Sequence, residues 1–171
     1  EALNLAVQWQ LPLLFVCENN DWQAFVHRRE TMPDNAIADW AAGLGLPVAT
    51  VDGNDVEAVH AAAREAVAAI RADGQPRFLE LVTYRLRGHF EPDDQAYVDA
   101  DELARWQARD PLQGQADRLL ALGALDAADL VQLRDRVAAR IEAAARFAQA
   151  SAWPDPRTLT HHVYAEQGAR S

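Results

Sequence analysis

The chain has 171 residues, of which half are apolar and a quarter are charged. This composition supports a packed core of one or two domains and excludes an intrinsically disordered chain. Sixteen basic residues against 26 acidic ones give a formal net charge of −10, which argues against a nucleic-acid or membrane-surface binder. The single cysteine, Cys17, excludes an internal disulfide and is typical of a reducing cytoplasm.

The first residues read as the inside of a helix. The chain starts at Glu1 without a methionine, and Leu3, Leu5 and Ala6 continue a helical apolar pattern that no capping residue precedes. We therefore expect a piece of a longer protein, truncated at its N-terminus.

Strand and helix patterns alternate over the first half of the chain. Short apolar runs at 11–17, 48–51 and 78–83 are typical of buried strands. Helical patterns at 37–44 and 56–70 separate them, and the polar stretch at 19–35 reads as a loop. This order predicts an α/β fold with a doubly wound, mostly parallel sheet.

Capping residues define the expected helix ends in this half. Asp34 or Asn35 precedes the first helix, and Asn54 with Glu57 forms a capping-box pattern before the second. Gly74 is placed to end that second helix.

A charged loop at 85–99 leads into a predominantly helical C-terminal part. Asp99 opens a helix that ends at Asp110-Pro111, a shorter helix follows, and Asp126 opens a long one before an extended tail. We expect residues 1–99 to form the sheet domain and residues 100–171 to form a helical extension packed on it.

Three polar clusters follow the three predicted strands, at 18–20, 52–54 and 84–89. Ligands of open parallel sheets bind beyond the carboxyl ends of the strands, so these clusters should meet. Arginines suit an anionic ligand and an asparagine oxygen suits Mg²⁺. The pattern therefore predicts a site for a metal-bound diphosphate.

Each cluster also has a simpler interpretation. The asparagines at 19–20 could simply form a turn. The residues at 52–54 are more often a helix cap than ligands, and we keep that interpretation for them. Arg85 and Arg87 could be a solvated surface pair, and His89 an ordinary loop histidine. Cys17 reads as a small core residue, and the histidines at 161–162 lack the acidic neighbours of a metal site.

Four segments resemble one protein family along nearly the whole chain. They are EALNLAVQWQLPLLFVCENN at 1–20, VDGNDVEAV at 51–59, RFLELVTYRLRGHFEPDDQAY at 77–97 and Asp110-Pro111-Leu112. Together they resemble the C-terminal portion of the α-subunit of thiamine diphosphate-dependent 2-oxo acid dehydrogenases, the first component of the pyruvate and acetoin types. The resemblance implies the thiamine diphosphate-binding fold.

The resemblance implies roles for several residues. Asn20 would ligate Mg²⁺ through its side-chain oxygen and Trp22 through its main-chain oxygen. Arg85 and His89 would lie against the diphosphate of the cofactor, with His89 also a catalytic residue. The loop that closes over the site would contain Arg87, Asp93, Asp94 and Tyr97.

The sequence also departs from the family pattern. The Gly-Asp-Gly that opens the family's cofactor motif would lie before residue 1, and its aspartate is a Mg²⁺ ligand. Val98 stands where the family usually has an arginine after the loop tyrosine. The carboxylate that activates the cofactor belongs to the β-subunit in this family.

The implied activity is oxidative cleavage of a 2-oxo acid or a hydroxyketone, with transfer of the acyl group to a lipoyl arm. The implied partners are the β-subunit, in an α2β2 assembly, and a lipoyl-bearing acyltransferase, in the cytoplasm. One alternative is a fragment or degenerate paralogue that acts only in assembly. A nucleotide-binding module is another, although the chain has no G-x-G-x-x-G or P-loop pattern.

Overall fold

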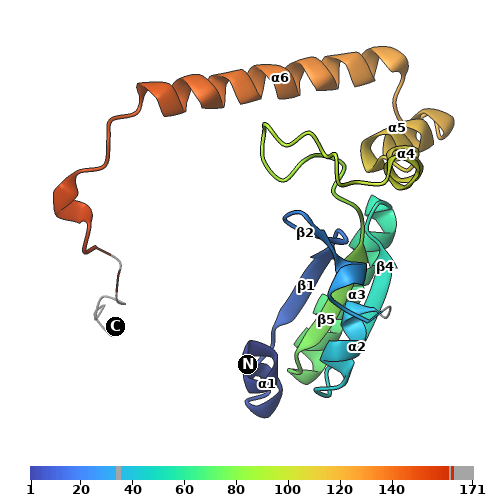
Figure 1. Ribbon diagram of the computed structural model, residues 1–171, viewed down its shortest axis with the longest axis vertical. Helices are drawn as coiled ribbons and strands as arrows, with labels where there is room; N and C mark the ends of the chain where they lie inside the picture. Colours follow the sequence, from blue (N-terminus) through green and yellow to red (C-terminus); the bar gives the residue numbers. More distant parts are fainter. Residues whose placement is uncertain (34–35, 162, 164–171) are drawn as a thin grey trace. The chain divides into compact units, whose positions relative to one another are not determined.

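A computed structural model describes residues 1–33, 36–161 and 163, which belong to two compact units, 1–122 and 123–171. Figure 1 labels the elements along the chain. The first unit contains α1 (Ala2–Gln8), β1 (Leu14–Asn19), β2 (Trp22–Gln23), β3 (Val26–His27), the 3₁₀ turn η1 (Arg28–Glu30), α2 (Ile37–Ala42), β4 (Val48–Asp52), α3 (Val56–Asp73), β5 (Arg77–Val82), α4 (Ala100–Gln107) and α5 (Pro111–Ala121). The second contains α6 (Ala127–Ala150) and η2 (Pro156–Thr158).

Three parallel strands form the central sheet of the first unit, in the order β1-β5-β4. Val82 at the end of β5 pairs with Asn19 of β1 and with Asp52 of β4, so all three strands end at one edge. The predicted parallel strands are confirmed, but of the three only β5 is largely buried, because β1 and β4 are the edges of the sheet and β4 is mostly exposed. The first begins at Leu14, because Pro12 has no N–H to offer a ladder.

Helices α2 and α3 cover opposite faces of this sheet. Phe78 packs in a core cluster with Ala38 and Ala41 of α2. Leu81 instead lines a hollow with Val59 of α3. Successive side chains of a strand point to opposite faces, so the odd and even positions of β5 meet different helices.

The buried carboxylate of Glu80 caps α2 from the middle of β5. Its oxygens accept hydrogen bonds from the backbone N–H groups of Ile37 (3.2 Å) and Ala38 (2.9 Å), and Ala36 at the N-cap makes no side-chain cap. The expected capping residues, Asp34 and Asn35, lie outside the described residues. Glu80 also accepts from the Asn19 side chain at 2.8 Å, so one carboxylate joins α2 to β1.

The N-cap of helix α3 lies one residue later than predicted. Asp55 and not Asn54 is its N-cap, accepting from the backbone N–H groups of Glu57 (3.0 Å) and Ala58 (3.1 Å). The Asn54 amide is used elsewhere, because it accepts from the Thr83 hydroxyl at 2.7 Å and donates to the Arg109 carbonyl at 2.8 Å. The predicted end at Gly74 is confirmed, with a left-handed φ of 70°.

The stretch at 19–35 is more ordered than the loop predicted for it. Strands β2 and β3 pair as a short antiparallel ribbon, with Trp22 opposite His27, and η1 follows directly. Two-residue strands are too short to show an alternating pattern, which explains why the sequence did not reveal them.

The helices after residue 99 begin at the predicted caps. Asp99 accepts from the Glu102 backbone N–H at 2.7 Å, and Asp110 caps α5, with Pro111 as its first residue. In the second unit, Asp126 and Asp129 form a reciprocal capping box at the start of α6. Among the residues that the structure describes, no helix combines the length and apolarity needed to cross a bilayer.

Candidate active site

The ends of β1 and β5 run side by side at the carboxyl edge of the sheet. The Thr83 backbone N–H donates to the Asn19 carbonyl at 2.9 Å, and that of Arg85 approaches the Asn20 carbonyl at 3.4 Å. Two of the three polar clusters expected to meet are therefore adjacent. The third is joined to them through the Thr83–Asn54 hydrogen bond.

The two asparagines after β1 have different surroundings. Asn19 is 8% exposed and its side chain is held by Glu80, so it is a structural residue. Asn20 turns its side-chain oxygen toward the Trp22 backbone N–H at 3.0 Å, which forms an Asx turn. An amide oxygen has two lone pairs, so this turn leaves Asn20 able to accept a second partner.

Arg85 lies under the ribbon and not on the surface. Its Nη2 donates to the Ala24 carbonyl at 2.6 Å and to the Tyr97 hydroxyl at 3.0 Å. Its guanidinium carbon lies 5.8 Å from the centroid of the Trp22 ring. The buried Nε of Arg85 has no hydrogen-bond partner among the described residues. An unsatisfied buried donor of this charge is suited to an anionic ligand.

Asp93 and Tyr97 tie the following loop to Arg85. The Tyr97 hydroxyl donates to Asp93 at 2.7 Å, and the same carboxylate oxygen accepts from the His89 backbone N–H at 2.6 Å. Burial by itself raises the pKa of Asp93, but the bonds from Tyr97 and from backbone amides outweigh it and lower that pKa overall. The network links the start of the loop to Asp93 and Tyr97.

His89 is exposed at the end of this network. Its Nδ1 lies 3.5 Å from Nη1 of Arg85, and a guanidinium can only donate, so Nδ1 is the acceptor. In the neutral ring the proton is then on Nε2, which is left as a donor. The Phe25 ring contacts the imidazole edge-on, with centroids 5.6 Å apart.

The other expected loop residues, Arg87 and Asp94, have different surroundings. Arg87 is exposed and lines a separate hollow with Gly88 and Phe90. Asp94 accepts from the Ala96 backbone N–H at 3.0 Å and so shapes the turn. The surface-pair alternative therefore describes Arg87 but not Arg85.

Sequence reasoning missed the part of the ribbon that faces this loop. Phe25 contacts Tyr97 with ring centroids 5.5 Å apart, and the Ala24 carbonyl receives Arg85. A backbone carbonyl has no sequence signature. The aromatic pair of Trp22 and Phe25 was the available signal.

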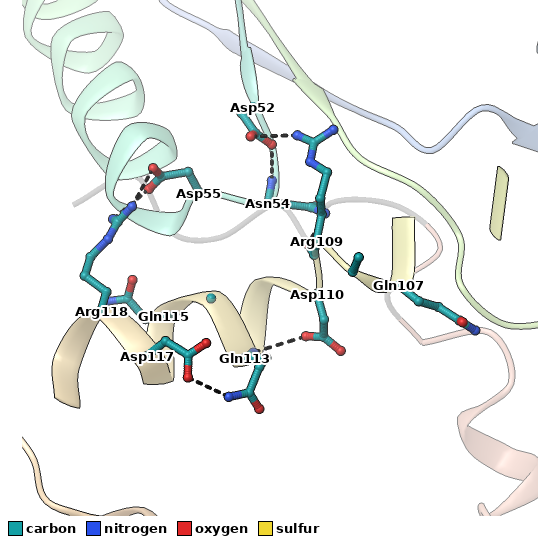
Figure 2. A pocket seen from close by; sticks show the side chains of 12 residues that line it. Asp52, Asn54, Asp55, Gln107, Arg109, Asp110, Gln113, Gln115, Asp117 and Arg118 are labelled. Atoms are coloured by element: carbon teal, nitrogen blue, oxygen red, sulfur yellow. Dashed lines mark hydrogen bonds and ion pairs between the residues drawn. The ribbon is translucent and has the colours of Figure 1, made fainter. Parts of the chain in front are cut away.

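A second polar hollow, of about 420 Å³, lies between the turn after β4 and helix α5. Figure 2 shows Arg109 directed toward Asp52 and Arg118 toward Asp55. The nitrogen–oxygen distances of these ion pairs are 2.8 and 2.9 Å, so each arginine already has a carboxylate partner. We interpret this hollow as the place where α5 is fastened to the sheet.

Few charged ligands are available for a cation. Within residues 1–33, 36–161 and 163, no group of three or more histidine, cysteine, aspartate and glutamate side chains is arranged to hold a metal ion. The ligands expected from this chain, Asn20 Oδ1 and the main-chain oxygen of Trp22, are amide and carbonyl oxygens. Such oxygens suit a hard cation like Mg²⁺, with further ligands from elsewhere.

Comparison with known families agrees with this arrangement. The family model described as dehydrogenase E1 component matches residues 1–157. The chain belongs to the dehydrogenase E1 component family. The predicted relation to the α-subunits of pyruvate and acetoin dehydrogenases is thereby confirmed.

Two relatives illustrate the range of the family. This E1 chain is 39% identical over 165 residues to the α-subunit of acetoin:2,6-dichlorophenolindophenol oxidoreductase of Bacillus subtilis, covering 96% of the chain and 49% of that protein. It is 34% identical over 168 residues to the pyruvate dehydrogenase E1 component α-subunit of Porphyra purpurea, covering 97% and 48%. The chain thus spans about half the length of the curated relatives it matches.

Proposed function

We propose that this chain forms part of the α-subunit of a thiamine diphosphate-dependent E1 enzyme with the doubly wound cofactor-binding fold. Its substrate would be a 2-oxo acid such as pyruvate or a hydroxyketone such as acetoin, with a lipoyl group as acceptor. The names of the relatives support these two substrate classes. When bound, thiamine diphosphate supplies the carbanion chemistry of the cleavage.

The observation that carries the proposal is the environment of Arg85. Its guanidinium is held by Ala24 and Tyr97, and its buried Nε is left without a partner. A diphosphate oxygen would satisfy that donor, and the Nε2 proton of His89 offers a second one nearby. These two residues would bind and orient the diphosphate.

Two other oxygens of this chain would hold the cation. The free lone pair of Asn20 Oδ1 and the main-chain oxygen of Trp22 would be its ligands from this chain. Both oxygens are neutral, so the charged ligand implied by the family pattern must come from outside the residues present here.

The loop at 85–99 would close over the bound cofactor. Tyr97 and Asp93 hold its base, Asp94 shapes its turn, and Arg87 is exposed on its outer side. His89 would then act as the catalytic residue of the loop, beside the diphosphate and the reacting acyl group. Closure would exclude water from that group.

The proposed partners are a β-subunit, which would supply the activating carboxylate in an α2β2 assembly, and a lipoyl-bearing acyltransferase. We place the enzyme in the cytoplasm. The rival proposal is that the protein serves only in assembly. It is supported by the neutral cation ligands, since the described residues include no cluster of charged side chains arranged to hold a metal ion.

Calorimetric titration separates the two. The full-length α-subunit that contains this chain, assembled with its β-subunit, is titrated with thiamine diphosphate in the presence of Mg²⁺. The proposal predicts saturable binding with a roughly micromolar dissociation constant that requires Mg²⁺. Absence of binding would support the assembly role.

A further inference from the structure

A buried hydrogen bond joins two segments that lie 75 residues apart. Nε2 of His27, at the end of the ribbon, lies 3.0 Å from Oε1 of Glu102 in the first turn of α4. The two residues are only 6% and 7% exposed. Arg29 adds a second bond at 3.0 Å to the other carboxylate oxygen.

The hydrogen bonds fix how this pair is protonated. Nδ1 of His27 accepts the backbone N–H of Arg29 at 3.1 Å, so in the neutral ring the proton is on Nε2 and is donated to Glu102. Burial by itself raises the pKa of Glu102, but Arg29 and His27 outweigh it, and the carboxyl pKa is lowered overall. The carboxylate is thus charged and satisfied by two donors from one short segment.

The ribbon held by Glu102 is also the ribbon that receives Arg85. Trp22 lies opposite His27 in the ribbon, with their rings 4.8 Å apart. Ala24, at the turn of the ribbon, accepts the guanidinium of Arg85. The loop at 85–99 is therefore fastened to one ribbon at both ends, by Arg85 where it begins and by Glu102 just after it ends.

We propose that Glu102 is a positioning residue that makes the ribbon and the loop at 85–99 a single ordered unit. This part of the inference rests on the proposed function: the unit keeps Asn20 and Trp22 at a fixed position relative to Arg85 and His89. Loss of His27 or Arg29 would leave the buried Glu102 carboxylate with an unsatisfied oxygen, which is energetically costly. The position of the ribbon therefore depends on Glu102, and the reverse also holds.

Hydrogen exchange in the assembled enzyme without cofactor tests this coupling. The variants are Glu102→Ala, His27→Ala and the double variant, with Asp101→Asn as the control because that exposed carboxylate is on the same helical turn. Loss of a hydrogen bond to a charged group should speed exchange roughly tenfold in both 22–27 and 85–97. The double variant should be no faster than the faster single variant, and the control should match the wild type.

Two results would overturn the proposal. Faster exchange in 22–27 with wild-type exchange in 85–97 would make the pair a local contact. Equally faster exchange across β4 and α3 would mean general destabilisation. Cofactor titration of the wild type is a separate measurement, so a failure of the proposed function would be visible there and would leave the exchange result interpretable.

Discussion

Arg85 donates a 2.6 Å hydrogen bond to the backbone carbonyl of Ala24, across 61 residues of sequence. The same guanidinium binds the Tyr97 hydroxyl at 3.0 Å. Both bonds are donated by Nη2 of Arg85, and they hold its side chain against the ribbon. Arg85 is therefore pre-organised before any ligand arrives, which reduces the cost of ordering it on binding.

Replacement of Arg85 by lysine should weaken thiamine diphosphate binding. An ammonium group keeps the charge but cannot reach Ala24, Tyr97 and an anion together as a planar fork does. We expect the dissociation constant to rise on the order of tenfold to a hundredfold, from the loss of hydrogen bonds between charged groups. Titration of Arg105→Lys, an exposed arginine on α4, is the control. Equal affinity of both variants would argue against the role of Arg85.

The catalytic role of His89 predicts a different effect for His89→Ala. The variant loses the weak 3.5 Å contact to Arg85 and one neutral donor to the diphosphate, so cofactor affinity should fall less than for Arg85→Lys. Acyl transfer to the lipoyl acceptor should slow by about a hundredfold or more, as for loss of a positioned proton donor. Stopped-flow kinetics measures both steps. An unchanged acyl-transfer rate would refute the assignment.

Gly88 should resist substitution for steric reasons. A Cβ on this residue would lie 2.7 Å from both the Cβ and the carbonyl oxygen of Asp93. Gly88→Ala must therefore displace Asp93 and loosen the loop, which limited proteolysis within 85–99 would detect. Gly114 in α5 has open space around it, and Gly114→Ala should stabilise the helix by about 0.5–1 kcal/mol. Indistinguishable proteolysis of the two variants would contradict this account of the loop.

The Asp55–Arg118 pair predicts an acid-sensitive contribution to stability. Its bidentate hydrogen bonds, with those from the Ala58 and Glu57 amides, hold the pKa of Asp55 well below its ordinary value of 3.8. Because the pKa of Asp55 is lower in the folded chain than in the unfolded chain, its ionised carboxylate stabilises the fold at pH values above 3.8. This contribution to the free energy of unfolding decreases as the pH falls below 3.8. Asparagine can still cap α3 but cannot form the ion pair.

Urea unfolding of the wild type and Asp55→Asn measures this contribution. The difference in unfolding free energy between the two should be largest near neutral pH and should shrink as the pH is lowered through 3.8 and beyond. A difference that stays constant down to the lowest accessible pH would show that the charge of Asp55 does not matter.

The sequence predicted the strands of the sheet better than the contacts that join its layers. The apolar run around Phe78 is the central strand and is largely buried, so its pattern is direct, whereas the run around Val48 reads equally well although β4 is mostly exposed. Glu80 interrupts the run around Phe78 with a charge whose partners come from α2 and β1. No local pattern indicates such partners, because they depend on how the chain folds back on itself.

The same limit applies to the candidate site. That Asn20 and Arg85 are neighbours could be predicted, because parallel strands end at one edge. That Ala24 and Glu102 hold the loop could not be predicted. Ala24 contributes only a backbone carbonyl, and an acidic residue in the first turn of a helix, such as Glu102, has a sufficient local explanation. The roles assigned to Asn20, Trp22, Arg85 and His89 stay predictions.

A crystal structure of the assembled enzyme with thiamine diphosphate and Mg²⁺ would show whether the cofactor occupies the proposed site. We expect diphosphate oxygens within hydrogen-bond distance of Arg85 Nε and His89 Nε2, with the cation on Asn20 Oδ1. A cofactor bound elsewhere, such as the polar hollow beside Arg109 and Arg118, would contradict this expectation (Figure 2).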